Sequence, residues 1–247
     1  MSLGVRPVLQ SPVTEYMRIV VLATIKGHMD RAAWIRERRR INEERMDVLF
    51  APIYDEHWGG HINPTHQHMV ERFLALLPSR AHVLDAACGT GKYWPLLLQA
   101  NQSLLGIDQS GGMVCQAQAK FPEVPTEKLG LQELSFQGTF DGIVCIDAME
   151  NVFPEDWLHV LRNFYRALKP HGLLYLTVEI PEDDLPTVFR TAVEAGLPVV
   201  EGEWVQEGAY HYYPPAERVR GWVEAAGFVS LDEVVGDGYH HVLARRG

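Results

Sequence analysis

The chain has 247 residues, of which 47% are hydrophobic and 22% charged, a composition typical of one globular domain with a short extension. Its formal net charge of −10 argues against general nucleic-acid binding, because affinity for phosphates needs clustered Lys and Arg. The three cysteines (Cys88, Cys115 and Cys145) form no C-x-x-C pair and favour a reducing compartment. No apolar run approaches the roughly twenty residues of a membrane span, and the N-terminus lacks a signal peptide's ordering, so we expect a cytoplasmic protein.

The N-terminal part of the chain is expected to be helical. From residue 13 to about residue 47 the apolar residues recur at helical spacing, and a break near Gly27 divides the segment into two helices. The mixed-charge run from Asp30 to Arg45 is interpreted as a solvated helix face, with an RNA-contacting arm as the less favoured alternative. Residues 51–64 form a connector rich in aromatics, histidine and glycine, which is poor helix material.

Strand and helix signals alternate after this connector. Pro64 and the apolar stripe that follows predict a helix up to Pro78, and further helices are predicted over 92–100, 111–120 and 155–168. Apolar runs predict strands over 82–86, 103–108, 126–129, 140–146 and 173–179. This alternation is typical of a parallel α/β sheet with right-handed crossovers.

The pattern changes after Pro181. A helix near 186–195 is followed by an irregular stretch to residue 214 and then by a helix at 215–226. The last two strands, at 228–235 and 239–245, are joined through Gly236-Asp237-Gly238, which is a hairpin signal. The predicted fold is therefore a mostly parallel α/β sheet with an antiparallel closing hairpin. Residues 1–52 are expected to form a helical extension, and residues 53–247 the main domain with an insertion at about 181–214.

One glycine turn is the clearest candidate for a ligand site. Residues 83–91 read V-L-D-A-A-C-G-T-G, an apolar strand that ends in an acid and a turn where a ligand can approach bare backbone. The third glycine of a dinucleotide loop is missing, and Asp85 suits an ammonium group better than a pyrophosphate. Asp108 ends the next strand and can accept both hydroxyls of a ribose. Together the two acids predict a ligand in which an amino acid is joined to a nucleoside.

Four segments, in this order and spacing, resemble the class I S-adenosylmethionine-dependent methyltransferases: residues 83–91, 106–110, 140–152 and 168–179. The resemblance begins at about Tyr54. It implies a Rossmann-like fold, S-adenosyl-L-methionine as the cofactor and a small-molecule methyl acceptor, with no nucleic-acid or membrane partner. The alternatives are an S-adenosylmethionine-binding module without catalysis and a nicotinamide oxidoreductase, which the missing glycine disfavours. The resemblance also implies that the N-terminal segment closes over the cofactor as a lid, although a homodimer interface through residues 13–50 is a competing interpretation.

The resemblance places the cofactor at the carboxyl ends of the first strands. The expected cofactor contacts are Tyr54, Asp85, Ala86, Gly89, Gly91, Asp108, Gln109, Met113, Leu131, Gln132 and Asp147. Gly130 stands where the family usually has an acid for the adenine amino group. Backbone groups at Leu131 and the side chain of Gln132 are the expected substitutes, and Met113 is either an adenine contact or a core methionine.

Two side chains are candidates for a catalytic base. Glu150 follows the fourth strand as a base or a substrate anchor, against the competing interpretation of a helix-start carboxylate favoured by the dipole. His211 lies in an aromatic stretch that is either a substrate-covering loop or an ordinary packed one, and imidazole titrates near neutrality. No metal is expected, because the histidines lack the closed ligand set that zinc needs. The expected substrate-binding residues are Trp58, His61, Met149, Tyr210 and Tyr212.

Overall fold

The computed structural model describes residues 30–99, 102–181, 183–206 and 208–247, so the helix predicted from residue 13 to the break near Gly27 lies outside the described residues. The helical elements are α2 (Arg31–Arg45), the π-helical turns η1 (Met46–Phe50) and η2 (Asp55–Gly59), α3 (Pro64–Leu76), α4 (Trp94–Gln99), α5 (Gly111–Lys120), the 3-10 turn η3 (Met149–Asn151), α6 (Trp157–Ala167), α7 (Leu185–Glu194) and α8 (Ala216–Ala225). The strands are β1 (His82–Ala86), β2 (Ser103–Asp108), β3 (Thr126–Lys128), β4 (Phe140–Cys145), β5 (Leu168–Glu179), β6 (Glu203–Gln206), β7 (Ala209–Tyr212), β8 (Phe228–Gly236) and β9 (Tyr239–Arg246). None of the described helices combines the length and the apolar character needed to cross a membrane.

Seven strands form one sheet in the order β3-β2-β1-β4-β5-β9-β8. The strands from β3 to β5 in this order are parallel, whereas β9 pairs antiparallel with both β5 and β8. The predicted Rossmann-like sheet with an antiparallel closing hairpin is confirmed. The strand order switches direction between β1 and β4, and ligands of such sheets bind at the carboxyl ends of the strands at this point.

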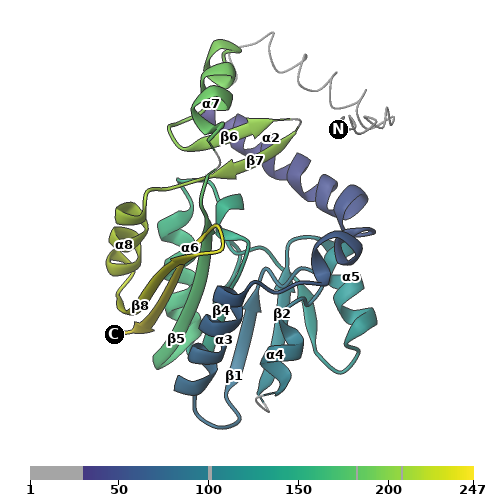
Figure 1. Cartoon of the computed structure of the whole chain (residues 1–247), viewed down its shortest axis with the longest axis vertical. Coiled ribbons are helices and arrows are strands. Elements are labelled where there is room, and N and C mark those ends of the chain that lie inside the picture. The colour runs from purple at the N-terminus through teal and green to yellow at the C-terminus, as the bar shows by residue number, and fades with distance from the viewer. Residues whose placement is uncertain (1–29, 100–101, 182, 207) are drawn as a thin grey trace, which may run out of the picture.

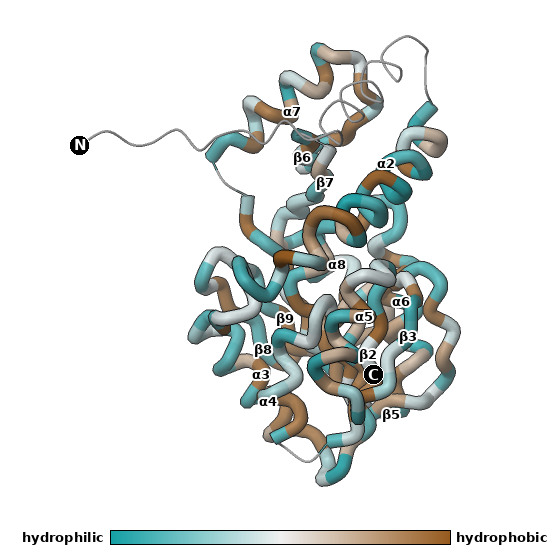
Figure 2. Tube along the Cα trace, turned by 90° about the vertical axis from the view of Figure 1, so that its right-hand side faces the viewer, coloured by the Kyte–Doolittle hydropathy of each residue, from teal (hydrophilic) through white to brown (hydrophobic). Residues whose placement is uncertain are grey.

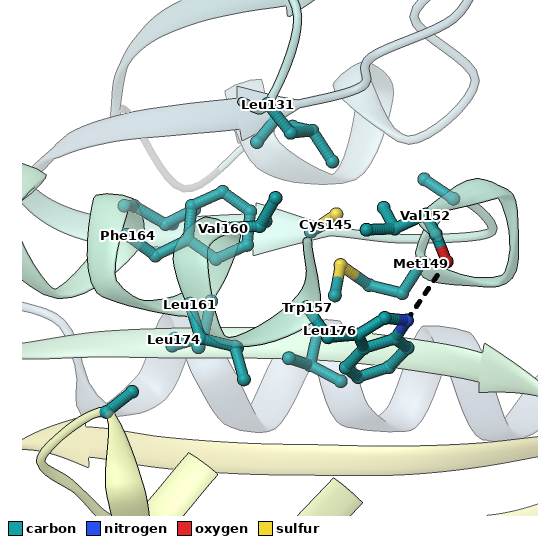
Figure 3. Close-up of a cluster of buried hydrophobic side chains, with 14 of the residues drawn as sticks. Leu131, Cys145, Met149, Val152, Trp157, Val160, Leu161, Phe164, Leu174 and Leu176 are labelled. Carbon is teal, nitrogen blue, oxygen red and sulfur yellow. Dashed lines mark hydrogen bonds between the residues drawn. The ribbon is translucent and has the colours of Figure 1, made fainter. Parts of the chain in front are cut away.

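Helices cover both faces of the sheet (Figure 1). Alternate residues of β1 point to opposite faces, so Leu84 joins the core beneath α6 and α8, while Val83 joins the core beneath α3 and α4. Figure 3 shows the first of these cores, in which the buried indole of Trp157 donates a hydrogen bond to the carbonyl of Val152 at 3.2 Å. This bond fixes the segment that follows β4, where the carboxyl edge of the sheet begins.

The prediction of an irregular stretch up to residue 214 is wrong. Strands β6 and β7 form a separate antiparallel hairpin, in which Glu203 pairs with Tyr212 and Gln206 with Ala209. Each strand has only four residues, and the buried side chain that opens β6 is a carboxylate, so no apolar alternation marks the strand in the sequence. Figures 1 and 2 both show this hairpin beside α7 and α2 at one end of the molecule.

The connector over residues 51–64 is more helical than its composition predicts. Phe50, Tyr54 and Trp58 are spaced four residues apart and form an aromatic row, in which the ring centroid of Trp58 lies 5.7 Å from that of Phe50 and 5.5 Å from that of Tyr54. Residues four apart share one face of a helix, so this aromatic row stabilises helical turns that the nearby glycines disfavour. The turn η2 is the result.

Candidate functional site

A cavity of about 360 Å³ lies at the carboxyl edge of the sheet, between the ends of β1, β2, β4 and β5 and the helical segment α2–η2. The sheet side of its wall comes from the turns that follow these strands, and hairpin β6–β7 and the start of β9 complete it. Thirteen of the residues proposed from the sequence line this cavity: Tyr54, Trp58, Asp85, Gly89, Asp108, Gln109, Met113, Leu131, Gln132, Asp147, Glu150, Tyr210 and His211.

The other five proposed site residues do not line the cavity: Ala86, Gly91, His61, Met149 and Tyr212. Ala86 is fully buried in the core, and His61 is exposed outside the cavity. Gly91 has φ 80°, and a Cβ there would lie 2.9 Å from the ring of Trp94. This glycine therefore allows α4 to pack closely and does not open a path for a ligand.

Met149 and Tyr212 belong to the core. Figure 3 shows Met149 between Cys145 and Trp157, and its side chain is fully buried. The ring of Tyr212 is also fully buried, and its hydroxyl accepts a hydrogen bond from Nη1 of Arg218 at 3.2 Å. Tyr212 packs against Trp157 and Trp222 in the core, whereas its neighbour in β7, His211, is only partly buried and lines the cavity.

Gly89 and Asp108 form an open cradle in the cavity. Gly89 has φ 54°, and no heavy atom lies within 4 Å of the position that its Cβ would occupy. Its backbone N–H donates to Oδ2 of Asp108 at 2.9 Å, and the N–H of Ser110 donates to Oδ1 at 2.8 Å. Burial raises the pKa of Asp108 to about 6, although these two hydrogen bonds oppose the shift. The carboxylate of Asp108 is thus held in a fixed orientation beside Gly89, where the backbone carries no side chain.

Asp85 lies deeper, under the glycine turn. Its side chain is 2% exposed, and Oδ2 accepts a hydrogen bond from Nε1 of Trp94 at 2.8 Å. Burial raises its pKa to about 7, and the charges of Asp108 and Asp147 add to the shift, whereas the indole hydrogen bond opposes it. A cationic ligand group close to these three acids would relieve their mutual repulsion.

Asp147 is held by cationic and hydroxyl groups. It has φ 54°, an uncommon backbone conformation for a residue other than glycine. Its carboxylate lies 2.9 Å from Nε2 of the fully buried His66, accepts from the hydroxyl of Tyr93 at 2.8 Å, and lies 3.5 Å from Nζ of Lys92. Burial alone would raise the pKa of Asp147, but these contacts together hold it below the usual value. The supporting His66 comes from the first turn of α3 and does not itself line the cavity.

At the other end of the cavity, His211 is oriented by an acid that the sequence analysis missed. Its Nδ1 lies 3.2 Å from Oε2 of Glu179 and 2.8 Å from the hydroxyl of Tyr213, which itself donates to the same oxygen of Glu179 at 3.3 Å. A carboxylate at Nδ1 fixes the tautomer in which Nε2 is the basic nitrogen. Glu179 ends β5 just as Asp85 and Asp108 end or nearly end their strands, and this position is the signal that could have identified it.

Glu150 is the most deeply buried acid at this end. Its side chain is 4% exposed, and Oε2 has no hydrogen-bond partner within the described part of the chain. Burial raises its pKa to about 8, and the charges of Asp147 and Glu179 add to this shift, whereas hydrogen bonds from the backbone N–H groups of Glu150 and Glu179 oppose it. Burial thus favours the protonated form of this carboxyl group.

Two acids fasten the helical segment over the glycine turn. Oδ1 of Asp47 accepts from the hydroxyl of Ser110 at 2.5 Å and from the N–H of Gly112 at 3.0 Å, at the first turn of α5. Oδ1 of Asp55 accepts from the hydroxyl of Thr90 at 2.5 Å, and Lys120 lies 2.7 Å from its other oxygen. These contacts keep the aromatic row of η1 and η2 against the cavity.

The remaining end of the cavity lies near β3. The carbonyl groups of Leu131 and Gln132 accept hydrogen bonds from Nδ2 of the buried Asn163 at 2.9 and 3.1 Å, which fixes this loop. A Cβ at Gly130 would meet only the far end of the exposed Glu133 side chain, which can move aside, so the local packing does not require glycine here. Among the residues that the structure describes, no three His, Cys, Asp or Glu side chains are grouped to hold a metal ion.

Comparisons with known proteins agree with this geometry. A family model described as a methyltransferase domain matches residues 83–172. Methyltransferase-like protein 27 of Homo sapiens is 32% identical over 172 residues, which cover 64% of this chain and 66% of that protein. A demethylmenaquinone methyltransferase of Lactiplantibacillus plantarum is 32% identical over 159 residues, which cover 60% of this chain and 66% of that protein. The chain thus spans just under two thirds of the length of these relatives.

The fold also resembles solved structures. The magnesium protoporphyrin IX methyltransferase of Synechocystis PCC 6803, solved with bound SAH, superposes with a TM-score of 0.62 at 20% identity. The match covers 85% of this chain and 100% of that one. At this level of identity the likeness concerns the arrangement of the strands and helices.

Proposed function

Because the chain belongs to the class I S-adenosylmethionine-dependent methyltransferases, we propose that it transfers a methyl group from S-adenosyl-L-methionine to a small-molecule acceptor. The observation that carries the proposal is the cradle of Gly89 and Asp108, where a side-chain-free turn and an oriented carboxylate face one cavity. The acceptor class is supported by the relative that is named for its action on demethylmenaquinone.

The cavity residues fit this cofactor chemically. Asp108 would accept the ribose hydroxyls, and the open face of Gly89 leaves room beside them. Asp85 and Asp147 would balance the positive charges of the amino acid part. Apolar side chains at the β3 end would contact the adenine, with the side chain of Gln132 as its polar partner; they are Met113, Leu129 and Leu131.

S-adenosyl-L-methionine, when bound, supplies a methyl group already activated by a sulfonium. The protein's own contribution is to orient the acceptor, exclude water and remove a proton where the acceptor carries one. We assign proton removal to His211, because Glu179 orients its ring and the residue lines the cavity. Glu150, the other candidate base, is the less favoured one because its Oε2 is buried and burial favours the protonated form of its carboxyl group.

A cofactor-binding test comes first. At about a hundredfold its Kd, S-adenosyl-L-methionine or S-adenosylhomocysteine should stabilise the protein by roughly 2.7 kcal/mol, measured as a rise in Tm. Asp108→Asn should remove most of that rise, because the ribose hydroxyls lose a charged acceptor. Glu127→Gln, an exposed acid on β3 outside the cavity, is the matched control and should leave the rise unchanged. Full affinity in the Asp108 variant would contradict the ribose assignment.

Methyl transfer is tested by release of S-adenosylhomocysteine in a screen of small-molecule acceptors. Release that depends on one acceptor class supports the enzyme. Tight cofactor binding without release for any acceptor would favour the alternative, a binding module without catalysis. Binding of NADH in place of S-adenosyl-L-methionine would contradict both.

A further inference from the structure

Lys92 and Asp147 form an ion pair in the wall of the cavity. Nζ of Lys92 lies 3.5 Å from Oδ2 of Asp147, and both residues line the cavity. Their side chains are 14% and 17% exposed, so the two charged groups are largely withdrawn from bulk water and are still accessible from the cavity. The pair thus presents a positive and a negative charge side by side to a ligand.

Both members of this pair keep hydrogen-bonding capacity for a further group. Nζ of Lys92 makes no hydrogen bond to another described residue, although an ammonium group has three donors. Each side-chain oxygen of Asp147 accepts one hydrogen bond, Oδ1 from Nε2 of His66 and Oδ2 from the hydroxyl of Tyr93. A carboxylate oxygen has two acceptor sites, so Asp147 can accept further hydrogen bonds from a ligand.

The pair matches the charges of an α-amino acid, whose ammonium and carboxylate groups are bonded to one carbon atom. Such a ligand needs a cation and an acid next to each other. Among the described residues that line the cavity, the lysine and arginine side chains are those of Lys92 and Arg45, and the guanidinium of Arg45 lies over the ring of Phe50. The nearby acid Asp85 is 2% exposed, and its Oδ2 is already bonded to Trp94. The pair is therefore the part of the wall that suits a zwitterion best.

We propose that Lys92 binds the carboxylate group and Asp147 the ammonium group of the cofactor's amino acid, and that His66 is a positioning residue that holds Asp147 for this contact. The inference rests on the proposed methyl transfer and deepens it, because it names the residues that distinguish the cofactor from a plain nucleoside. Charge-assisted hydrogen bonds of this kind are roughly twice as strong as neutral ones.

The geometry around His66 explains how a residue outside the cavity can set the direction of one inside it. His66 is fully buried, and its Nε2 lies 2.9 Å from Oδ1 of Asp147, which as a carboxylate oxygen accepts the hydrogen bond. The rings of Tyr239 and His241 meet the imidazole edge to face, each with its centroid 4.7 Å away, so the imidazole has little freedom to rotate. The position of Oδ1 is therefore fixed from behind the cavity wall.

The backbone and the second oxygen of Asp147 are held as well. Its N–H donates to Oγ1 of Thr177 at 2.8 Å, and its φ of 54° is a conformation that residues other than glycine adopt only where the surroundings fix it. The hydroxyl of Tyr93 lies 2.8 Å from Oδ2. A carboxylate held at three points loses little conformational freedom when a ligand binds, so more of the contact appears as affinity.

Binding of four nucleosides to the full chain tests the charge assignment, with Kd from calorimetric titration as the readout. S-adenosylhomocysteine carries both charged groups, its decarboxylated analogue lacks the carboxylate, its deaminated analogue lacks the ammonium, and 5′-methylthioadenosine lacks both. Wild type should bind S-adenosylhomocysteine about tenfold or more tightly than 5′-methylthioadenosine, because a hydrogen bond to a charged group contributes about that factor.

Two variants should divide these ligands in opposite ways. Lys92→Met should weaken binding of S-adenosylhomocysteine and of the deaminated analogue by about tenfold, and should not weaken binding of the decarboxylated analogue. Asp147→Asn should weaken S-adenosylhomocysteine and the decarboxylated analogue, and should not weaken the deaminated one. Lys169→Met is the matched control, since Lys169 also pairs with an acid, Asp141, but lies outside the cavity. It should leave all four affinities unchanged.

The positioning role is tested by the hydrogen bond that His66 supplies. His66→Gln, which can place an N–H near the position of Nε2, should keep the affinity for S-adenosylhomocysteine within a few-fold of wild type. His66→Phe, which has no donor, should lose about tenfold for the two ligands with an ammonium group and keep its affinity for the other two. Tyr93→Phe removes a single hydroxyl and should show the same selective loss, which keeps the test valid if a His66 variant does not fold.

The pattern of binding separates this inference from the proposed function. Equal affinity of wild type for S-adenosylhomocysteine and 5′-methylthioadenosine would overturn the inference and leave cofactor binding and methyl transfer intact. Equal losses for all four ligands in the folded His66→Phe and Tyr93→Phe variants would overturn the positioning role. Failure of all four nucleosides to bind wild type would contradict the proposed function itself.

Discussion

Glu179 and His211 form a pair in which one side chain sets the chemistry of the other. Glu179 is partly exposed, and its Oε2 holds both Nδ1 of His211 and the hydroxyl of Tyr213. The carboxylate therefore orients the imidazole, while the imidazole faces the cavity. At this scale, Glu179 is a positioning residue and His211 is the group that would contact the acceptor.

His211→Ala is expected to lower kcat by roughly a hundredfold or more, because general-base catalysis contributes about that factor. Imidazole added to the buffer should restore part of the activity, and cofactor affinity should stay at the wild-type value. Glu179→Gln should lower kcat more than it raises KM for the acceptor. The exposed His61→Ala is the control and should leave all these quantities unchanged. Full turnover by His211→Ala would show that orientation alone drives the reaction.

The sequence predicted which residues line the cavity where chemistry and position coincide. Asp108 and Gly89 could be identified because a strand-end acid and a turn glycine have few other uses at that edge of a sheet. Gly91 and Tyr212 could not be separated from cavity residues, since only the packing shows that Trp94 fills the space beside Gly91 and that β7 turns Tyr212 inward. Glu179 was missed because it was assigned to the end of the apolar strand predicted over 173–179 and was not considered as a site residue.

The helical segment from α2 to η2 is the element that covers the cavity. Asp47 fastens it to the first turn of α5, and Asp55 fastens it to Thr90 in the glycine turn. Between these two points the aromatic row of Phe50, Tyr54 and Trp58 contributes to the cavity wall. Trp34 and Ile35 of α2 are packed in the hydrophobic core, so the part of the segment that can open without disrupting the core is the stretch from η1 to η2, which is held by these polar contacts.

We expect this segment to behave as a lid. S-adenosyl-L-methionine should protect residues 30–66 from limited proteolysis at any protein concentration. Asp55→Ala should weaken both the protection and the cofactor affinity by about tenfold, since a hydrogen bond to a charged group contributes about 1.5–3 kcal/mol. Glu56→Ala, the exposed neighbour, is the control. Protection that follows protein concentration and ignores the cofactor would identify a dimer interface instead.

Element boundaries were predictable where apolar runs end sharply. The predicted strands 82–86 and 103–108 and the predicted helix 111–120 have the observed bounds of β1, β2 and α5. Hairpin β6–β7 was not predictable, because its strands are short and their buried side chains are a carboxylate and two tyrosines, which give no aliphatic alternation in the sequence. η2 was not predicted because the aromatic row offsets the unfavourable glycines.

On the scale of the whole molecule, a buried ion pair joins two segments that lie 172 positions apart in the sequence. Glu203 is fully buried and accepts hydrogen bonds from Nη1 and Nη2 of Arg31 at 2.7 and 2.5 Å. It also accepts from the N–H of Val200 at 2.8 Å and the hydroxyl of Tyr210 at 2.7 Å. The carboxylate is thus fully paired, and α2 is anchored to hairpin β6–β7 (Figure 1).

Glu203→Gln should destabilise the protein by about 2–3 kcal/mol in urea unfolding. Breaking a buried pair typically costs about 3–5 kcal/mol, and Arg31 keeps its second partner, Glu155, which lessens the loss. Glu155→Gln is the matched control. Its side chain is 46% exposed, so we expect a change below about 1 kcal/mol. Equal losses in the two variants would contradict the central role of Glu203.

The pair between Arg31 and Glu203 also sets an order of events during synthesis of the chain. The two residues are separated by 172 positions, so at about 5–20 residues per second Arg31 leaves the ribosome roughly 10–30 s before its partner. During this interval the first turn of α2 lacks its buried partner and can pair only with the half-exposed Glu155, and the carboxyl edge of the growing sheet is not yet closed by the hairpin. A nascent chain that stalls before residue 203 can pair most of its parallel strands, yet it cannot complete this closure. The enclosed cavity is therefore a late product of translation, made only after five of the seven sheet strands have emerged.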